Sequence, residues 1–272
     1  CSSPSLNLTW FCATLPGELR SVAGWFGTLQ KIMTTIANKL QSVHTQIHEA
    51  CQKCGRQPTQ VSLLAVSKTF PAEAVREAAL AGQRAFGENY IQEGVDKIAA
   101  VRAMVDVPAL VWHCIGPIQS NKTKLVAQHF DWAHTVDRDK IAQRLNDQRP
   151  EELPPLQVCI QVNVDGGSTK SGCTPQQALE LAHVITQLPR LQLRGVMSIP
   201  DPQADDAAML QVHRKVVQVF EDIRASGMAG LERFDTISLG MTADMHTAIA
   251  AGSTMVRVGS GIFGARDYSH KA

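Results

Sequence analysis

One lysine in this chain stands where an amine could do covalent chemistry. Lys68 ends the run VSLLAVSK (61–68), in which most residues before it are apolar, so the sequence places it at the end of a predicted buried strand. A desolvated amine has a depressed pKa and can form a Schiff base with a carbonyl group. Most lysines are simply solvated, so the meaning of Lys68 depends on what lies opposite it.

Two segments rich in small residues offer a site for a phosphate group. SLGMT (238–242) and VGSG (258–261) each follow an apolar run near the end of the chain. Small residues let backbone N–H groups approach an anion, and the N-terminus of a following helix adds partial positive charge. Glycines at strand ends are mostly turn residues, but here two such segments follow the last two predicted strands. A lysine opposite a phosphate site suggests either pyridoxal phosphate or a sugar-phosphate aldolase.

The elements that must position these residues alternate regularly between strand and helix. Strand-like runs occupy 61–68, 84–87, 110–116, 130–136, 156–164, 191–199, 234–240 and 253–264. All but the last are followed by a helical pattern, and eight such units in about 210 residues predict a (β/α)₈ TIM-type barrel. Barrels carry their sites at the carboxyl ends of the strands, often with phosphate after the last two. The alternative, an open doubly wound sheet, normally has G-x-G-x-x-G after its first strand, and that motif is absent here.

The region before the first strand divides into two parts. Residues 33–54 predict an amphipathic helix, with Ile36, Leu40 and Val43 on one stripe. We expect this helix to pack beside the last strand as the eighth helix of the ring. Residues 1–32 show no sustained periodicity, so we expect an N-terminal extension that is poorly ordered. The sequence therefore predicts a single barrel domain over 33–272.

Composition excludes several classes of function. The net charge is +1 and aromatic residues make up 5%, so neither a basic nor a base-stacking surface for nucleic acid is expected. No apolar run reaches the about 18 residues that a membrane span needs. Seven irregularly spaced cysteines predict a reducing compartment, and hence a cytoplasmic protein. Two histidines and two cysteines in 44–54 share one helix side and could not surround a metal ion, so no metal site is expected.

Five motifs, in this order, resemble those of the YggS/PROSC-type pyridoxal phosphate homeostasis family: LLAVSKTFPAEAV, FGENYIQEGVDK, WHCIGPIQSNK, LQLRGVMSIP and ISLGMTADMHTAIAAGSTMVRVGSGIFGARDY. The resemblance covers about residues 33–270. It implies a fold-type III barrel for pyridoxal 5′-phosphate (PLP), like the N-terminal domain of alanine racemase, without the second β-domain of that enzyme.

The resemblance also implies a role for individual residues. Lys68 would hold PLP as an internal aldimine, and Asn89 and His113 would line the cofactor ring. The phosphate would be surrounded by Ser238, Gly240, Met241, Gly259 and Ser260. Arg257 would face the pyridine nitrogen. Because an arginine cannot accept a proton, it would keep that nitrogen unprotonated and the ring a weak electron sink.

Two functions are compatible with this site, a carrier of PLP and an amino-acid racemase. Racemisation in this fold needs a base on each face of the cofactor, normally the lysine and a tyrosine from a separate β-domain. The chain has only Tyr90 and Tyr268, and both fall within barrel motifs. We therefore expect a non-catalytic, monomeric protein that buffers PLP or delivers it to apo forms of PLP-dependent enzymes, with a racemase as the alternative.

Overall fold

Eight parallel strands close into a barrel. The computed structural model describes residues 17–166 and 171–264, with side chains from residue 35 onward. The strands are β1 (Ser62–Val66), β2 (Ala85–Glu88), β3 (Val111–Cys114), β4 (Trp132–Val136), β5 (Leu156–Gln161), β6 (Leu191–Met197), β7 (Thr236–Ser238) and β8 (Met255–Val258). Each pairs with its neighbours in the chain, and β8 pairs with β1. The predicted TIM-type barrel is confirmed.

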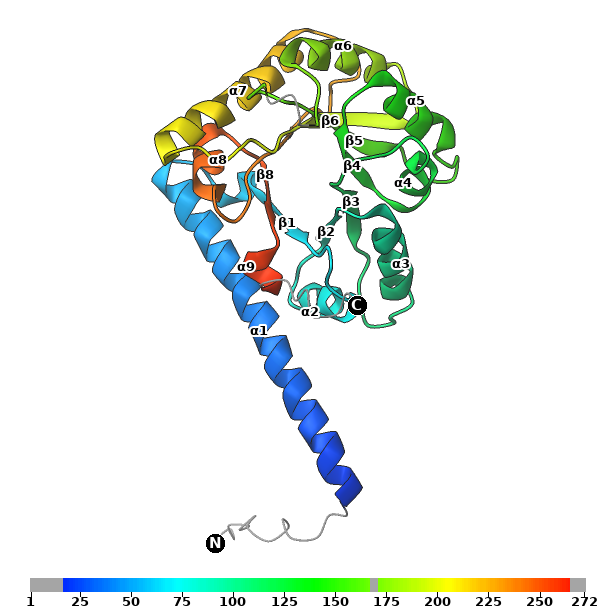
Figure 1. Cartoon of the computed structure of the whole chain (residues 1–272), viewed down its shortest axis with the longest axis vertical. Coiled ribbons are helices and arrows are strands. Elements are labelled where there is room, and N and C mark those ends of the chain that lie inside the picture. The colour runs from blue at the N-terminus through cyan, green and yellow to red at the C-terminus, as the bar shows by residue number, and fades with distance from the viewer. Residues whose placement is uncertain (1–16, 167–170, 265–272) are drawn as a thin grey trace, which may run out of the picture.

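Helices surround the strands on the outside (Figure 1). They are α1 (Gly17–Lys53), the 3₁₀ turn η1 (Pro58–Gln60), α2 (Ala72–Leu80), α3 (Ile91–Arg102), α4 (Thr123–His129), α5 (Asp139–Gln148), α6 (Pro175–Thr186), α7 (Asp206–Ala225), α8 (Met245–Ala251) and α9 (Ser260–Phe263). The short α9 lies in the segment that the sequence presented as a glycine-rich turn. Across the described ranges, no helix combines the length and apolar character needed to cross a membrane.

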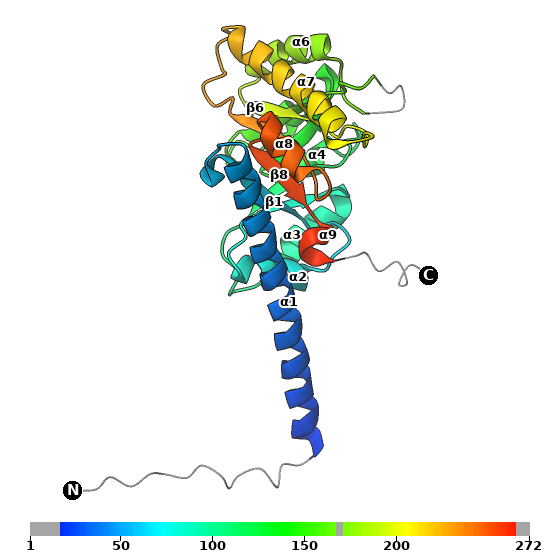
Figure 2. The ribbon, with the colours of Figure 1, turned by 90° about the vertical axis from the view of Figure 1, so that its left-hand side faces the viewer.

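Helix α1 fills the place in the ring after β8, where the chain itself has only the four-residue α9. It packs against α2, α8 and α9, and the predicted stripe of Ile36, Leu40 and Val43 is buried there. The helix begins at Gly17, well before the predicted start at residue 33. Figures 1 and 2 show why the apolar stripe did not mark this start: the N-terminal half of α1 projects away from the barrel and has no core beside it. Residues 1–16 of the predicted extension lie outside the described residues.

Removal of residues 1–31 should leave the barrel intact. Among the side chains that the structure describes, Ile36 is the first buried one on α1, so the deletion removes none of the described contacts with the core. We expect the free energy of unfolding, measured by urea denaturation, to change by less than about 1 kcal/mol. A matched deletion of residues 1–54, which also removes the buried stripe, should destabilise the protein strongly. A large loss of stability from the shorter deletion would contradict the prediction.

The period of two along each strand decides which side chains enter the barrel. On β1, Leu63 and Ala65 join the large cluster between strands and helices, whereas Leu64 and Val66 belong to a small separate cluster inside the barrel. The same alternation points Lys68 inward, two residues beyond Val66. On the neighbouring strand β8, Arg257 lies opposite Leu64 in the register and also points inward.

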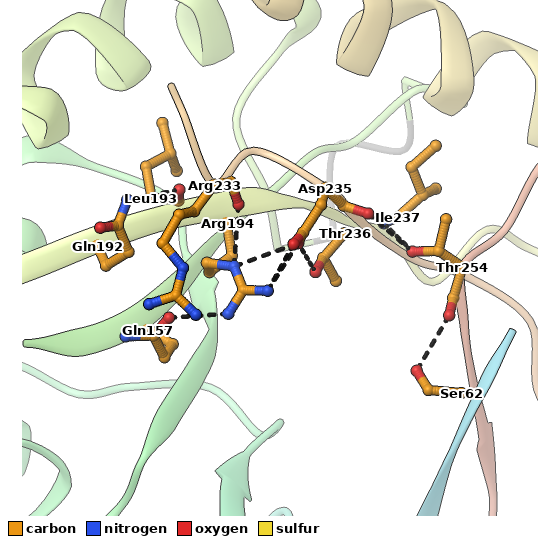
Figure 3. Close-up of polar contacts among 10 residues, drawn as sticks. All are labelled: Ser62, Gln157, Gln192, Leu193, Arg194, Arg233, Asp235, Thr236, Ile237 and Thr254. Carbon is orange, nitrogen blue, oxygen red and sulfur yellow. Dashed lines mark hydrogen bonds and ion pairs between the residues drawn. The ribbon is translucent and has the colours of Figure 1, made fainter. Parts of the chain in front are cut away.

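The amino-terminal end of the barrel is tied by polar contacts between neighbouring strands (Figure 3). Arg194 on β6 forms a two-oxygen ion pair with Asp235, at 2.7 and 2.8 Å from Nη2. Its other Nη donates to Gln157 on β5 at 2.9 Å. The guanidinium also lies 4.7 Å from the centre of the Trp132 ring, inside the barrel. These contacts fix the end of the barrel that faces away from the predicted site.

Candidate functional site

A cavity of about 330 Å³ opens at the carboxyl ends of the strands. It is lined by Lys68 after β1, Asn89 after β2, Met241 after β7, and Arg257, Gly259 and Ser260 at the end of β8. Apolar walls are added by Phe70, Ile115 and Ile199. The structure thus brings together the predicted lysine, the predicted arginine and both glycine-containing segments. The predicted residues His113, Ser238 and Gly240 do not line this cavity and lie behind its wall.

Lys68 reaches the cavity from a turn with unusual backbone geometry. The strand ends at Val66, and Ser67 is fully buried while Lys68 is half-buried. The next residue, Thr69, has a φ of 67°. A β-branched side chain rarely adopts this left-handed conformation, so the turn that presents Lys68 is strained.

Asn89 supplies a polar atom that no described residue satisfies. Its Oδ1 is buried and, within the described part of the chain, accepts no hydrogen bond. Gly116, after β3, leaves room for Asn89. Any residue with a Cβ at position 116 would overlap the Asn89 carbonyl oxygen. A buried oxygen without a donor is costly in a finished protein, so Asn89 is ready to accept a hydrogen bond from a ligand in the cavity.

The two glycine-containing segments lie side by side. The N–H of Arg257 donates to the Gly240 carbonyl at 3.0 Å. Gly240 has a φ of 94°, and a Cβ there would come within 2.5 Å of the Ala248 Cβ. The N–H of Met241 donates to Asp244 Oδ1 at 2.7 Å. At Gly259, a Cβ would meet the Val66 carbonyl oxygen at 3.2 Å. Glycine at these positions lets the first segment pack closely against α8 and the second against β1.

Arg257 is a buried cation that, within 17–166 and 171–264, forms no ion pair with a carboxylate, although Asp244 lies close enough to act on its charge. It is 4% exposed, and its guanidinium donates to Ser238 O at 2.6 Å, to Ser238 Oγ at 2.9 Å and to Ser198 O at 2.9 Å. Among the described residues, no carboxylate forms an ion pair with it. Burial lowers the pKa of Arg257 to about 10, so the group stays charged at neutral pH. Its charge is therefore available to an acceptor in the cavity.

Two buried histidines continue from Arg257 toward the other end of the barrel. His134 Nδ1 lies 3.0 Å from Ser238 Oγ, and His134 Nε2 lies 2.9 Å from His113 Nδ1. Ser238 Oγ accepts from Arg257 and can donate its own proton to His134 Nδ1, and in that tautomer the neutral His134 donates from Nε2 to His113. Both histidines are neutral: burial lowers the pKa of His113 to about 3 and that of His134 well below its usual value.

At its far end, this chain of contacts reaches Arg194 and Trp132 at the amino-terminal end of the barrel. His113 stacks on Trp132, with ring centres 5.0 Å apart and planes inclined by 17°. Trp132 in turn faces Arg194. His113, which the family resemblance placed beside the cofactor ring, is thus linked to Arg257 through His134 and Ser238. Sequence reasoning missed His134, although its inward position in the strand run 130–136 was a signal for it.

The donor set fits a phosphate-bearing aromatic aldehyde. The cavity has an amine, a charged guanidinium, an unsatisfied amide oxygen, exposed glycine backbone and apolar walls. An aldehyde fits the lysine, a flat ring fits the apolar walls, a ring nitrogen fits the arginine, and a phosphate fits the glycine-containing segments. The fit rests on these residues alone.

Comparison with known proteins agrees with this geometry. A family model described as the N-terminal domain of alanine racemase matches residues 39–267. The pyridoxal phosphate homeostasis protein of Escherichia coli (strain K12) is 53% identical over 239 residues, which are 88% of this chain and 100% of that protein. The protein of the same name from Vibrio alginolyticus is 54% identical over 237 residues, 87% of this chain and 100% of that protein.

Solved structures show the same barrel. PipY of Synechococcus elongatus PCC7942, with PLP bound, has a TM-score of 0.72 and 34% identity, covering 84% of this chain and 100% of that chain. An alanine racemase from Clostridium difficile 630 has a TM-score of 0.65 at 12% identity, covering 87% of this chain but 58% of the racemase, and shows the fold alone. The chain belongs to the family of pyridoxal phosphate homeostasis proteins, built on the fold of the alanine racemase N-terminal domain.

Proposed function

We propose that this chain binds PLP in the cavity at the carboxyl ends of its strands and holds it for delivery to other proteins. The observation that carries the proposal is the convergence of Lys68, Arg257 and the two glycine-containing segments on one cavity. The kinship supports it, because relatives at about half identity are named pyridoxal phosphate homeostasis proteins, and PipY has been solved with PLP bound.

Each predicted residue has a separate task in this proposal. The amine of Lys68 forms a Schiff base with the PLP aldehyde. Gly259, Ser260 and Met241 receive the phosphate, and Asn89 accepts a hydrogen bond from the bound group. Ser238 and His113 do not line the cavity. They act indirectly, because their contacts orient Arg257. When bound, PLP supplies an electron-accepting ring, and an arginine beside its nitrogen keeps that ring a weak electron sink.

The geometry favours a carrier over a racemase. A racemase needs a second base opposite the lysine, and Tyr90 is 54% exposed and does not line the cavity. Tyr268, the other tyrosine of the sequence, lies outside the described residues. A charged Arg257, fixed by Ser238 and Ser198, further opposes carbanion formation on the ring. The function that we propose is therefore that of a PLP carrier without substantial catalysis.

Incubation with amino acids should separate the two functions. Purified protein loaded with PLP is incubated with each common amino acid in deuterated water, and chiral chromatography follows both enantiomers. Because a positioned base contributes typically about 10²–10⁴-fold to proton abstraction, we expect turnover far below about 1 s⁻¹, the low end of ordinary enzymes. The same loaded protein, mixed with an apo form of a PLP-dependent enzyme, should restore that enzyme's activity. Racemisation near 1 s⁻¹ that Lys68→Ala abolishes would establish the racemase instead.

Three further parts of the proposal concern the oligomeric state of the protein, its location in the cell and its partners. We propose a monomer that works in the cytoplasm, with apo forms of PLP-dependent enzymes as recipients. Sedimentation of the loaded protein at several concentrations tests the first part. Location by fractionation of the source cells tests the second, and transfer to a panel of apo-enzymes tests the third.

A further inference from the structure

A buried cluster of charges lies directly behind Lys68. Glu88 ends β2, and Glu93 and Lys97 lie one turn apart on α3. The ammonium of Lys97 donates to Glu88 Oε1 at 2.7 Å and lies 3.1 Å from Glu93 Oε1. Its third contact is the carbonyl oxygen of Ser67, at 2.7 Å. All three donors of this ammonium are therefore used by protein oxygens.

The contacts of the cluster converge on the two residues that flank Lys68. On one side, the Ser67 hydroxyl donates to Glu88 Oε1 at 2.6 Å, and Lys97 holds the Ser67 carbonyl. On the other side, the N–H of Thr69 donates to Glu93 Oε1 at 2.6 Å. Lys68 itself lines the cavity. The backbone on both sides of the reactive residue is thus tied to one set of charges.

The cluster also accounts for the strained turn. Thr69 is the one residue other than glycine with positive φ among the described residues, at 67°. Such a conformation persists only where the surroundings enforce it, and strained residues concentrate at functional sites. The bond from Thr69 N–H to Glu93, which Lys97 holds in place, helps to enforce it, together with the backbone hydrogen bond from Phe70 N–H to the Ser67 carbonyl at 3.1 Å.

Stability alone does not explain these charges. Lys97 and Glu88 have side chains that are 5% and 0% exposed. Burial raises the pKa of Glu88 while Lys97 opposes that rise. Buried ion pairs are often no better for stability than apolar residues of the same volume, because desolvation offsets the attraction. What an apolar pair could not do is hold a carbonyl and an N–H on either side of Lys68.

We propose that Glu93, anchored by Lys97, is a positioning residue that holds the turn 67–69 in the conformation that presents the Lys68 amine to the cavity. The inference rests on the proposed function, and it adds that the turn sets the rate at which the covalent link forms. In that step the neutral Lys68 amine adds to the aldehyde carbon of PLP. A C=N bond replaces the C=O bond, and the oxygen leaves as water with two protons.

Substitutions at Glu93 test the proposal without disturbing the buried pair. Glu93→Ala removes the acceptor for the Thr69 N–H, and its side chain is already 34% exposed, so the protein should fold. Glu93→Gln keeps an amide oxygen as acceptor and is the matched control. Stopped-flow mixing of apo-protein with PLP measures how fast the borohydride-reducible absorbance appears. We expect Glu93→Ala to slow this step about tenfold, since small misplacement of a reacting group is costly, and Glu93→Gln to stay close to wild type.

A second variant isolates the strain. Thr69→Gly lets the turn adopt positive φ without cost, so it should restore most of the rate in the Glu93→Ala background. The affinity for PLP, measured by fluorescence titration without borohydride, should change little in any of these variants. The proposal is overturned if Glu93→Ala reacts at the wild-type rate, if Glu93→Gln is equally slow, or if Thr69→Gly gives no rescue. Failure of wild type to form an adduct on Lys68 would instead overturn the proposed function.

Discussion

Replacement of Lys68 by alanine should abolish the borohydride-stable adduct between this chain and PLP. Lys68 is the lysine that lines the cavity in which Arg257 and both glycine-containing segments meet. Without its amine, no C=N bond can form there, so borohydride cannot fix PLP to the protein at this position. The measurement is mass spectrometry of peptides after PLP loading and reduction, in which the peptide containing residue 68 should lose its modification entirely.

PLP should still bind to Lys68→Ala, but more weakly. The two glycine-containing segments and Arg257 are untouched by the substitution, so reversible binding should remain while the covalent contribution is lost. We expect the affinity to fall by about tenfold or more, where each tenfold corresponds to about 1.4 kcal/mol. Lys124→Ala, on the exposed face of α4, is the control and should keep both adduct and affinity. An adduct on another lysine of the wild-type protein would show that PLP is not held in this cavity by Lys68.

The barrel and the position of Lys68 could be predicted from sequence because both follow from local pattern. The alternation of apolar runs with helical stripes fixed the number and order of the elements, and β1 ends within two residues of the predicted strand end. Strand ends in a parallel barrel meet at one edge, so residues at 68, 238–242 and 257–261 had to meet there. The outcome needed no knowledge of side-chain contacts.

The second layer of the site could not be predicted in this way. Glu88, Glu93 and Lys97 fall in the motif FGENYIQEGVDK, but charges at helical spacing are typical of a solvated face, and only the fold turns them toward Ser67 and Thr69. The positive φ of Thr69 leaves no trace in composition or periodicity. The phosphate role inferred for Ser238 from its neighbours likewise gave no hint of its bonds to Arg257 and His134.

The two buried histidines should make the protein lose stability steeply in mild acid. The folded-state pKa of His113 is about 3 against an ordinary value of 6.5, and that of His134 is also well below 6.5. Burial is the main cause for both. Arg194 adds to the effect at His113, whereas His113 and Arg257 add to it at His134. His113 therefore stays neutral in the folded protein at pH 5, and the lowered pKa of His134 likewise favours its neutral form, while the unfolded chain binds a proton at each histidine as the pH falls below 6.5.

Because the unfolded state binds more protons, the free energy of unfolding falls as pH falls below 6.5, at about 1.4 kcal/mol per pH unit for each histidine. Between pH 7 and pH 5 this amounts to about 2 kcal/mol for His113, a large share of a total stability of about 5–15 kcal/mol, and the lowered pKa of His134 acts in the same direction. The loss continues until the pH reaches the folded-state pKa, about 3 for His113. Urea denaturation at a series of pH values measures the slope.

A glutamine at position 134 isolates the contribution of one histidine. Its amide can accept from Ser238 and donate to His113 but does not titrate, so His134→Gln should make the slope between pH 7 and pH 5 clearly shallower. Glu88 works in the opposite direction, because burial raises its folded-state pKa, but it is present in both proteins and cancels in the comparison. His183→Gln, on the exposed side of α6, should leave the slope unchanged. Equal slopes for wild type and His134→Gln would mean that His134 is not held neutral, and the donor order from Arg257 to His113 would then be wrong.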